Sequence, residues 1–313
     1  MFKFKIIPDN INFNFLKFKY IAFIFSFILI SVTFIFLFFK GLNFGIDFKG
    51  GTLIELKSKN NQVVDLAKFR ERALSLKAGE ISVQKFGKNT DVLLRIQKQD
   101  GDNNKQMEII EKAKKHFEED FVIRRTEFVG PVVGDELKNA GITAVLLALF
   151  LIMIYIWFRF EWQFSIAAIV ALTHDVITTI GLFSVFNLEF NLAIVAAILT
   201  TAGYSINDTV VVFDRVRENL RKYKSQDHYY IYNKSINETL SRTIITSITT
   251  LIALIIIYFF GGAVLSDFAL AMIWGVIIGT YSSIFIAVSC LTYFKIYKGD
   301  KKDTSEPIPE YER

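Results

Sequence analysis

The sequence predicts a polytopic α-helical membrane protein with six transmembrane helices and one α+β ferredoxin-like periplasmic domain. Three observations lead to this prediction. Hydrophobic residues make up 52% of the 313 residues and charged residues only 21%, below the roughly 25% that is usual for soluble domains. The apolar residues are gathered in long runs. One stretch between the first two runs has instead the spacing of strands and helices in a small soluble domain.

Six apolar runs have the length of membrane-spanning helices, since about 20 mostly apolar residues cross the hydrocarbon core. They cover residues 20–39, 139–158, 164–186, 190–213, 239–260 and 268–294. Backbone polar groups in hydrocarbon must be satisfied within the segment, so we expect each run to be a helix. The first run is too long for the apolar part of a signal peptide, and no small-x-small cleavage site follows it. We therefore expect it to remain as an anchor.

The orientation follows from the lysine and arginine residues of the connecting segments. The tails 1–19 and 295–313 and the loop 214–238 are rich in both residue types, whereas the turns near 187–191 and 261–267 have none. Short basic segments stay in the cytoplasm. Both termini and the loop 214–238 are therefore expected to be cytoplasmic, and residues 40–138 to lie on the outer side.

The outer segment has the pattern of one compact domain at about 52–129. Its expected elements are a strand at 52–57, a helix at 64–76, two strands at 81–86 and 90–96, a helix at 104–117 and a strand at 121–129. Gly87, Lys88 and Asn89 give a hairpin signal between the two central strands. The order βαββαβ is that of ferredoxin-like domains. Because this fold hosts many functions, it indicates none by itself.

Two glycine-bearing stretches flank the outer domain. Gly45, Asp47, Gly50 and Gly51 precede it, and Gly130, Pro131 and Gly134 follow it. A Gly-Gly pair after an aspartate is compatible with a phosphate loop, but the Walker lysine pattern and the Rossmann strand–glycine–helix unit are both missing. We interpret the two stretches as tight connections in which glycine permits a positive φ.

A few ionisable or amide side chains lie within the apolar runs. They are His174 and Asp175 in the third run, Asn207 and Asp208 in the fourth, Arg242 in the fifth, and Asp267 at the outer mouth of the sixth. Such residues are costly in a bilayer and indicate function by default. Asp267 is interpreted as an interfacial residue. The single Cys and the three scattered His residues exclude a disulfide framework and indicate no metal site.

Three consecutive spanning helices carry polar faces, because residues three and four apart lie on one side of a helix. Asp175 shares such a face with two threonines of its helix, and Arg242 shares one with several threonines of the next basic helix. Asp208 and Arg242 are expected at similar depth, where they could pair. Two interpretations stay open: a fixed structural bridge, and a proton relay in which a helix movement separates the two groups.

The motifs together resemble the SecD/SecF family of bacterial protein-export membrane subunits. The resemblance rests on residues 44–52, on 129–134, on His174-Asp175, on the long motif 203–219 with Gly203 at its start, and on Ser241-Arg242-Thr243. The match covers nearly the whole chain. One short chain with one outer domain is similar to the SecF branch rather than to the SecD branch or a fused protein.

The resemblance implies a complex of the RND superfamily, in the bacterial inner membrane, that pairs with SecD to give twelve helices. It implies association with the SecYEG channel, YajC and YidC, preproteins as substrates, and protons as the coupling ion, with no cofactor and no ATPase activity. In the family the fourth-helix Asp and fifth-helix Arg are tied to proton coupling, and these match Asp208 and Arg242. Asp175, His174 and Asn207 are further candidates for the relay.

Three other interpretations remain. A half-RND proton-coupled transporter of small solutes would share the charged midplane but would need a substrate pocket. An intramembrane aspartyl protease would use Asp175 and Asp208 as a carboxyl pair, although the Gly-x-Gly-Asp pattern of such proteases is missing around Asp208. A structural scaffold would tolerate neutral replacements of the charged pair.

Overall fold

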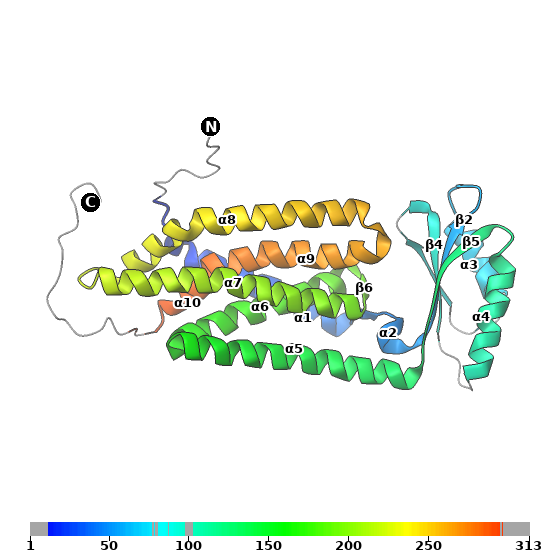
Figure 1. Cartoon of the computed structure of the whole chain (residues 1–313), viewed down its shortest axis with the longest axis horizontal. Coiled ribbons are helices and arrows are strands. Elements are labelled where there is room, and N and C mark those ends of the chain that lie inside the picture. Colours follow the sequence, from blue (N-terminus) through cyan, green and yellow to red (C-terminus); the bar gives the residue numbers. More distant parts are fainter. Residues whose placement is uncertain are drawn as a thin grey trace.

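The computed structural model describes residues 12–76, 78, 81–86, 88–97, 103–294 and 296. It is elongated, with a bundle of long helices along its length and a small sheet domain at one end (Figure 1). Between the two parts lie a helical turn, α2 (Ile46–Lys49), and a strand pair, β1 (Asn43–Phe44) with β6 (Glu189–Phe190). The predicted class, a polytopic helical membrane protein with one α+β domain, is confirmed.

Six helices are long and apolar enough to cross a membrane. Their bounds are α1 (Lys19–Phe39) preceded by the short turn η1 (Phe15–Phe18), α5 (Pro131–Arg159), α6 (Trp162–Phe186), α7 (Leu192–Lys222), α8 (His228–Phe260), and a last helix composed of α9 (Gly262–Ser282), the π-helical turn η2 (Ser283–Ala287) and α10 (Val288–Leu291). The chain is thus a multi-pass membrane protein.

Several helices extend beyond the predicted spans. Helix α7 continues past residue 213 to Lys222 and α8 already begins at His228, so that most of the expected loop 214–238 is helical. Asp227 caps α8, since its side chain accepts a hydrogen bond from the amide of Tyr229 at 3.2 Å. The apolar runs mark only the part of each helix that lies in hydrocarbon, and the polar helical ends reach water.

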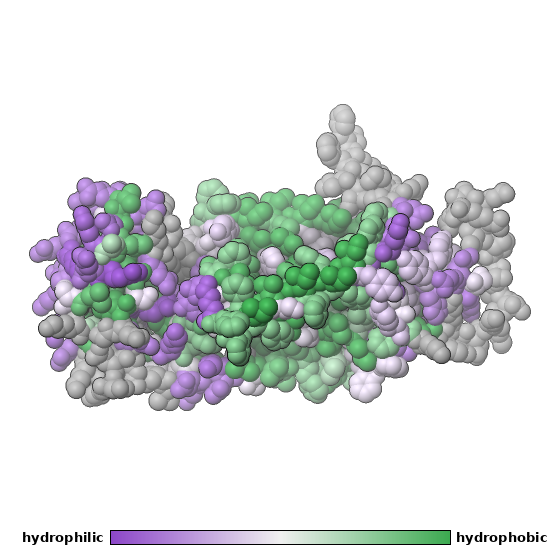
Figure 2. Space-filling view, turned by 180° about the vertical axis from the view of Figure 1, so that it is seen from behind, coloured by the Kyte–Doolittle hydropathy of each residue, from purple (hydrophilic) through white to green (hydrophobic). Residues whose placement is uncertain are grey.

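The surface of the bundle is apolar around its middle and polar at both ends (Figure 2). Side chains on α1, α5 and α8 are widely exposed there: Phe38 by 84%, Phe158 by 88% and Phe260 by 85%. Soluble proteins rarely expose apolar patches of this size to water. The band is therefore the lipid-facing surface, and it separates the outer domain from the opposite end, where α7 joins α8 (Figure 1).

The outer domain has the predicted order βαββαβ. Its elements are β2 (Gly51–Ser58), α3 (Leu66–Leu74), β3 (Ile81–Phe86), β4 (Lys88–Ile96), α4 (Asn103–Phe117) and β5 (Phe121–Val129). The four strands form an antiparallel sheet in the order β3-β4-β2-β5. Gly87 of the predicted hairpin lies outside the described residues. Phe69 and Phe117, from the two helices, pack with Leu56 and Leu94 in the core on one face of the sheet.

Small residues allow the central helices of the bundle to cross closely, as is usual between spanning helices. On α9, a Cβ added to Gly275 would lie 2.0 Å from Thr201 Cγ2, and one added to Gly279 would lie 2.9 Å from Ser205 Cβ. On α6, a Cβ added to Gly181 would lie 1.9 Å from the hydroxyl of Thr33. These crossings bring polar side chains of α6, α7 and α9 into contact.

Candidate functional site

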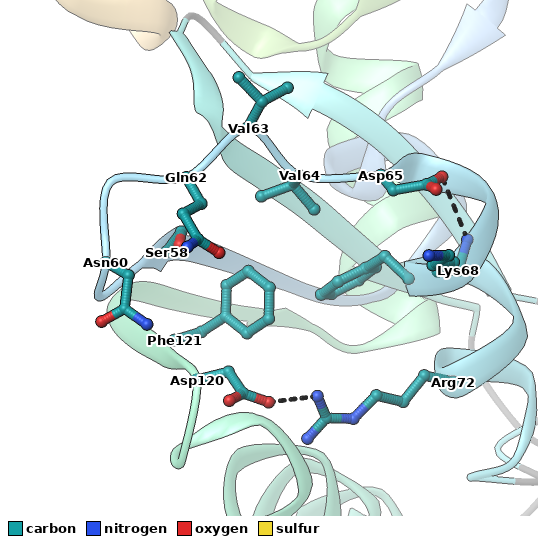
Figure 3. Close-up of a pocket in the computed structure, with 11 residues that line it drawn as sticks. Ser58, Asn60, Gln62, Val63, Val64, Asp65, Lys68, Arg72, Asp120 and Phe121 are labelled. Atoms are coloured by element: carbon teal, nitrogen blue, oxygen red, sulfur yellow. Dashed lines mark hydrogen bonds and ion pairs between the residues drawn. The ribbon is translucent and has the colours of Figure 1, made fainter.

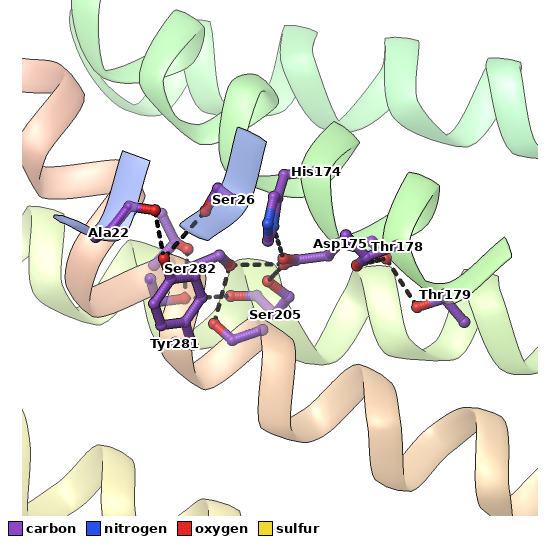
Figure 4. A network of polar contacts seen from close by, with 12 residues as sticks. Ala22, Ser26, His174, Asp175, Thr178, Thr179, Ser205, Tyr281 and Ser282 are labelled. Atoms are coloured by element: carbon purple, nitrogen blue, oxygen red, sulfur yellow. Dashed lines mark hydrogen bonds and ion pairs between the residues drawn. The ribbon is translucent and has the colours of Figure 1, made fainter. Parts of the chain in front are cut away.

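Asp175 is the centre of a buried polar network between three helices (Figure 4). Its side chain, on α6, is 1% exposed. One carboxyl oxygen, Oδ2, accepts hydrogen bonds from Ser205 on α7 at 2.6 Å and from Ser282 on α9 at 2.7 Å. The other oxygen, Oδ1, lies 3.0 Å from Nδ1 of His174. Donors from three helices thus converge on one carboxyl group inside the bundle.

The two threonines that follow Asp175 do not serve the carboxyl group. The hydroxyls of Thr178 and Thr179 donate to the main-chain carbonyl of Asp175, at 3.1 and 2.7 Å. Both side chains are buried. Threonines often satisfy their hydroxyl in this way within a helix, so the polar face of α6 acts through His174 and Asp175 alone.

His174 joins the network to α1. Its ring lies 6.1 Å from the ring of Tyr281, centroid to centroid. Tyr281 donates to the carbonyl of Ala22 at 2.8 Å, and its hydroxyl lies 3.0 Å from that of Ser26 (Figure 4). Among the described residues, Nε2 of His174 has no hydrogen-bond partner. The imidazole therefore has one nitrogen committed to Asp175 and one free.

Hydroxyls near the π-helical turn extend the network towards Asp208. Ser283 lies 2.8 Å from the hydroxyl of Thr209, and its own hydroxyl donates to the carbonyl of Ser205 at 3.3 Å. Single π-helical turns often occur at functional sites. Sequence reasoning did not identify Tyr281, Ser282 and Ser283. The signal was present, since three hydroxyl residues in a row interrupt an apolar helix.

Asp208 lies on α7 one turn beyond Ser205, a rise of about 5 Å. Its side chain is 4% exposed, and among the described residues its Oδ2 atom has no hydrogen-bond partner. A buried carboxylate without a partner is costly in free energy. This position therefore requires a proton or a cationic neighbour. The network also keeps Asp175 apart from Asp208, because the described hydrogen bonds of Asp175 go to hydroxyls and to His174.

The predicted direct pairing of Asp208 with Arg242 is not present in the structure. Among the described residues, neither the ion pairs nor the hydrogen bonds join the two side chains. Asp208 faces the inside of the bundle, whereas Arg242, on α8, is exposed. The arginine is still near enough for its charge to act on the aspartate.

Small and polar residues form an exposed strip beside Asp208, which we call the open polar strip. It consists of Ala196, Thr200, Gly203 and Asn207 on α7 and of Arg242 and Thr249 on α8. The α7 members recur at three or four residues, which places them on one face. A Cβ added to Gly203 would meet nothing within 4 Å. Polar groups are costly against lipid tails, so this strip calls for a protein neighbour.

The glycine-bearing stretches have two physical explanations. Gly50 and Gly51 have φ values of 71° and 123° where α2 turns into β2, a region that favours glycine. Gly45 and Gly134 are sites of close approach: an added Cβ would lie 2.7 Å from Oε1 of Glu189 and 3.1 Å from the carbonyl oxygen of Phe48, respectively.

The other residues of these stretches mark helix starts. Gly130 has an ordinary φ of −67° before α5, and nothing in the structure explains the glycine there; Pro131 is the first residue of α5. Asp47 accepts a hydrogen bond from the amide of Leu192, at the start of α7, at 2.9 Å.

Two hollows lie in or beside the outer domain, away from the buried carboxyl groups. One, of about 270 Å³, has Phe69 and Phe121 among its lining residues, and Arg72 and Asp120 pair at its rim at 2.5 Å (Figure 3). The other, of about 480 Å³, adjoins Gly50. No group of three or more potential metal ligands occurs among the described residues.

The fold and this polar centre define a multi-pass membrane protein with ionisable groups inside its helix bundle and a ferredoxin-like domain outside it. A family model described as "Protein export membrane protein SecD/SecF, C-terminal" matches residues 109–296, and one described as "SecD/SecF GG Motif" matches residues 35–62. The chain belongs to the SecD/SecF family.

Its relatives include proteins named protein translocase subunit SecF. The chain is 44% identical to that of Rickettsia bellii over 303 residues, which cover 96% of this chain and 99% of the relative. It is 44% identical to that of Rickettsia rickettsii over 304 residues, 96% of this chain and 98% of the relative. The predicted resemblance to the SecF branch is confirmed.

Two solved structures of SecDF are also similar. One is described as a translocon-associated membrane protein from Thermus thermophilus; it matches with a TM-score of 0.82 and 35% identity over 92% of this chain. Another, in a super-membrane-facing form, has a TM-score of 0.66 and 35% identity over 91% of this chain. In both cases the present chain spans 39% of the solved chain.

Proposed function

We propose that this chain is the SecF-type subunit of a protein-export complex. Together with a SecD-type partner, it uses the proton motive force to promote translocation of preproteins through the SecYEG channel and their release on the periplasmic side. Protons are the coupling ion, with no other cofactor and no ATPase activity in this chain. YajC and YidC are proposed as further partners. The nearly full-length similarity to proteins named translocase subunits supports this assignment.

The observation that carries the proposal is a buried, unpartnered carboxyl group beside an exposed cation. Asp208 is enclosed by its own bundle, whereas Arg242 and Asn207 face outwards. A helix movement that brings Arg242 towards Asp208, or withdraws it, changes the free energy of ionising the carboxyl group. Asp208 would then take up a proton in one arrangement and release it in the other. Asp175 and His174 are proposed as a second proton-holding group.

The SecD-type partner is proposed to cover the open polar strip. Small residues such as Gly203 and Thr200 let another helix approach closely, and polar side chains of that helix can bond across the contact. Arg242 would then lie between two subunits rather than in lipid. This arrangement explains why the bundle leaves a charged residue exposed at membrane depth.

We further propose that the chain lies in the bacterial inner membrane with both termini in the cytoplasm. The basic segments support this orientation. The α7–α8 connection lies at the opposite end of the bundle from the sheet domain (Figure 1), and the cations Arg215, Arg217 and Lys222 gather near it. Basic residues near helix ends are typical of the cytoplasmic side. The sheet domain is then periplasmic.

The test is pulse-chase export in cells depleted of this chain and supplied with wild type, Asp208→Asn or Arg242→Met. We expect both variants to reach wild-type membrane levels, to retain the partner, and to leave precursors unprocessed. The matched controls are Asp214→Asn, an exposed acid on the same helix, and Lys234→Met, a cation on the same helix as Arg242. Both controls are expected to restore export.

Two outcomes contradict the proposal. If Asp208→Asn and Arg242→Met both restore export, the pair is structural and the chain is a scaffold. If wild type itself makes no difference to export, the transport of a small solute becomes the better explanation of the buried carboxyl groups.

A further inference from the structure

The single turn α2 contacts both halves of the molecule. Ile46 is buried against Leu53 and Leu93 on the face of the sheet opposite to α3 and α4. Phe48, two residues later, is buried among bundle side chains that include Ile194 near the start of α7. One helical turn thus places neighbouring apolar side chains into two separate cores, and its position is fixed from both sides.

Between these two residues, Asp47 bonds directly to the outer end of α7. Its Oδ2 atom accepts the amide hydrogen of Leu192 at 2.9 Å. The start of α7 has a cap of its own as well, since Asn191 accepts from the amide of Ile194 at 3.2 Å. A carboxylate at a helix N-terminus satisfies a free amide and is favoured by the helix dipole. Asp47 therefore ties the outer domain to the helix that carries Asp208.

A second contact ties the sheet itself to the start of α7. Arg95, on β4, forms an ion pair with Glu189, on β6, and both side chains are 13% exposed. Glu189 is three residues before Leu192 and is paired in the short parallel ladder with Asn43 of β1. The acids Asp47 and Asp267 also face Glu189. A half-enclosed cation from the outer domain is thus held by the segment that leads into α7.

We propose that Asp47 and the Arg95–Glu189 pair form a rigid coupling joint, through which movement of α7 is passed to the outer domain. This inference rests on the proposed function. Helix α7 is continuous over 31 residues from Leu192 to Lys222, and Asp208 lies within it. A shift or tilt of α7 on proton exchange therefore moves its outer end. Because that end is bonded to Asp47 and held by Arg95, the sheet moves with it.

The test separates proton movement from export, since a merely structural role would affect both. Asp47→Ala, Arg95→Gln and Glu189→Gln are assayed in the complex with the SecD-type partner, for precursor export and for proton flux in membrane vesicles. We expect these variants to lose export while they keep wild-type proton flux. The charge-swapped double variant, Arg95→Glu with Glu189→Arg, is expected to recover export.

Matched controls are available in the same domain. Asp65→Ala removes a cap from α3, where Asp65 accepts from the amide of Ala67 at 3.0 Å. Arg72→Gln breaks the ion pair with Asp120. Both leave the joint intact and are expected to retain export and proton flux.

A reversible lock tests the rigidity of the joint. Asn43 and Glu189 are opposite each other in the ladder, so cysteines at these positions lie within the usual range of a disulfide. In a Cys290→Ser background, the reduced double-cysteine variant lacks the Glu189 charge and is expected to lose export. Oxidation replaces the ion pair by a covalent bond and is expected to restore it.

The outcomes are distinguishable from a failure of the proposed function, because Asp208→Asn is assayed alongside. If Asp208→Asn abolishes export and the joint variants do not reduce it, the joint is refuted and the proposed function stands. If oxidation blocks export, the joint has to open during the cycle, and the rigid joint is refuted. If Asp208→Asn has no effect, the proposed function fails first.

Discussion

At the scale of single residues, the two buried aspartates of the bundle have opposite surroundings. Asp175 receives two hydroxyl donors and lies beside His174. Asp208 has an unpartnered oxygen and only the distant charge of Arg242. Donors that fully satisfy a buried carboxyl group hold it in one state. Asp208 is therefore the group whose protonation a moving neighbour can change most easily.

Glu189 gives a prediction of pH dependence. Burial raises the pKa of this carboxyl above its ordinary value, more than Arg95 lowers it, and Asp267 and Asp47 raise it further. A group whose pKa is raised on folding adds stability while it is protonated, below about pH 4.3, and this contribution is lost as the pH rises through the pKa of the folded state. We therefore expect the stability of Glu189→Gln, relative to wild type, to increase with rising pH over this window.

Thermal unfolding of the complex between pH 4 and 8 measures this difference, which amounts to about 1.4 kcal/mol for each pKa unit. Lys49→Gln, an exposed cation of the same joint region, serves as the control for a general effect of charge. If Glu189→Gln instead becomes relatively less stable as the pH rises, the attraction of Arg95 outweighs burial and the sign is wrong.

At the scale of helices, the α7–α9 crossing has little tolerance for added volume. In Gly275→Ala the new methyl group would lie 2.0 Å from Thr201 Cγ2, so one helix has to shift. Overpacking of this kind costs about 1–3 kcal/mol. We expect a lower unfolding temperature of the purified chain, and partial recovery in the double variant with Thr201→Ala, which removes the opposing atoms.

The control is Gly203→Ala on the exposed side of α7, where an added Cβ meets nothing within 4 Å. It is expected to leave the unfolding temperature of the isolated chain at or above that of wild type. An equal loss in both variants would show that glycine is needed for a reason other than the crossing.

The helices and the sheet could be predicted because their signals are local. Apolar runs such as 20–39 and alternating runs such as 121–129 specify their own structure, and the structure places α1 and β5 there. The end of α7 could not be predicted in this way. Its extension to Lys222 is polar and owes its helix to tertiary contacts, such as Asn219 donating to Glu238 at 2.7 Å.

The site was predictable in part. Charged residues in apolar runs stand out, so His174, Asp175, Asp208 and Arg242 were identified from the sequence. Which of them meet depends on which face of each helix turns inward. Spacing along one helix does not determine this, and the expected pairing of Asp208 with Arg242 failed for that reason.

At the scale of the whole molecule, the open polar strip predicts where a second subunit binds. Gly203→Leu adds a large side chain at a position that faces nothing within this chain. We expect the isolated chain to keep its stability, whereas the amount of SecD-type partner recovered with it from membranes falls sharply, because close helix approach is blocked. Quantitative co-purification measures this effect.

Ala144→Leu is a suitable control, since Ala144 is also exposed on a spanning helix, α5, but lies among apolar neighbours. It is expected to leave partner recovery unchanged. Normal recovery with Gly203→Leu would place the partner on another face of the bundle.

The contact between Asp47 and Leu192 also constrains how the chain is made. The two residues are 145 positions apart, so the ribosome completes the outer domain and two further spanning helices before the acceptor of this bond meets its donor. Domains generally fold as units during synthesis. A nascent chain that stops after α6 therefore has a folded outer domain without its anchorage, and biogenesis ends only when the fourth crossing of the membrane is complete.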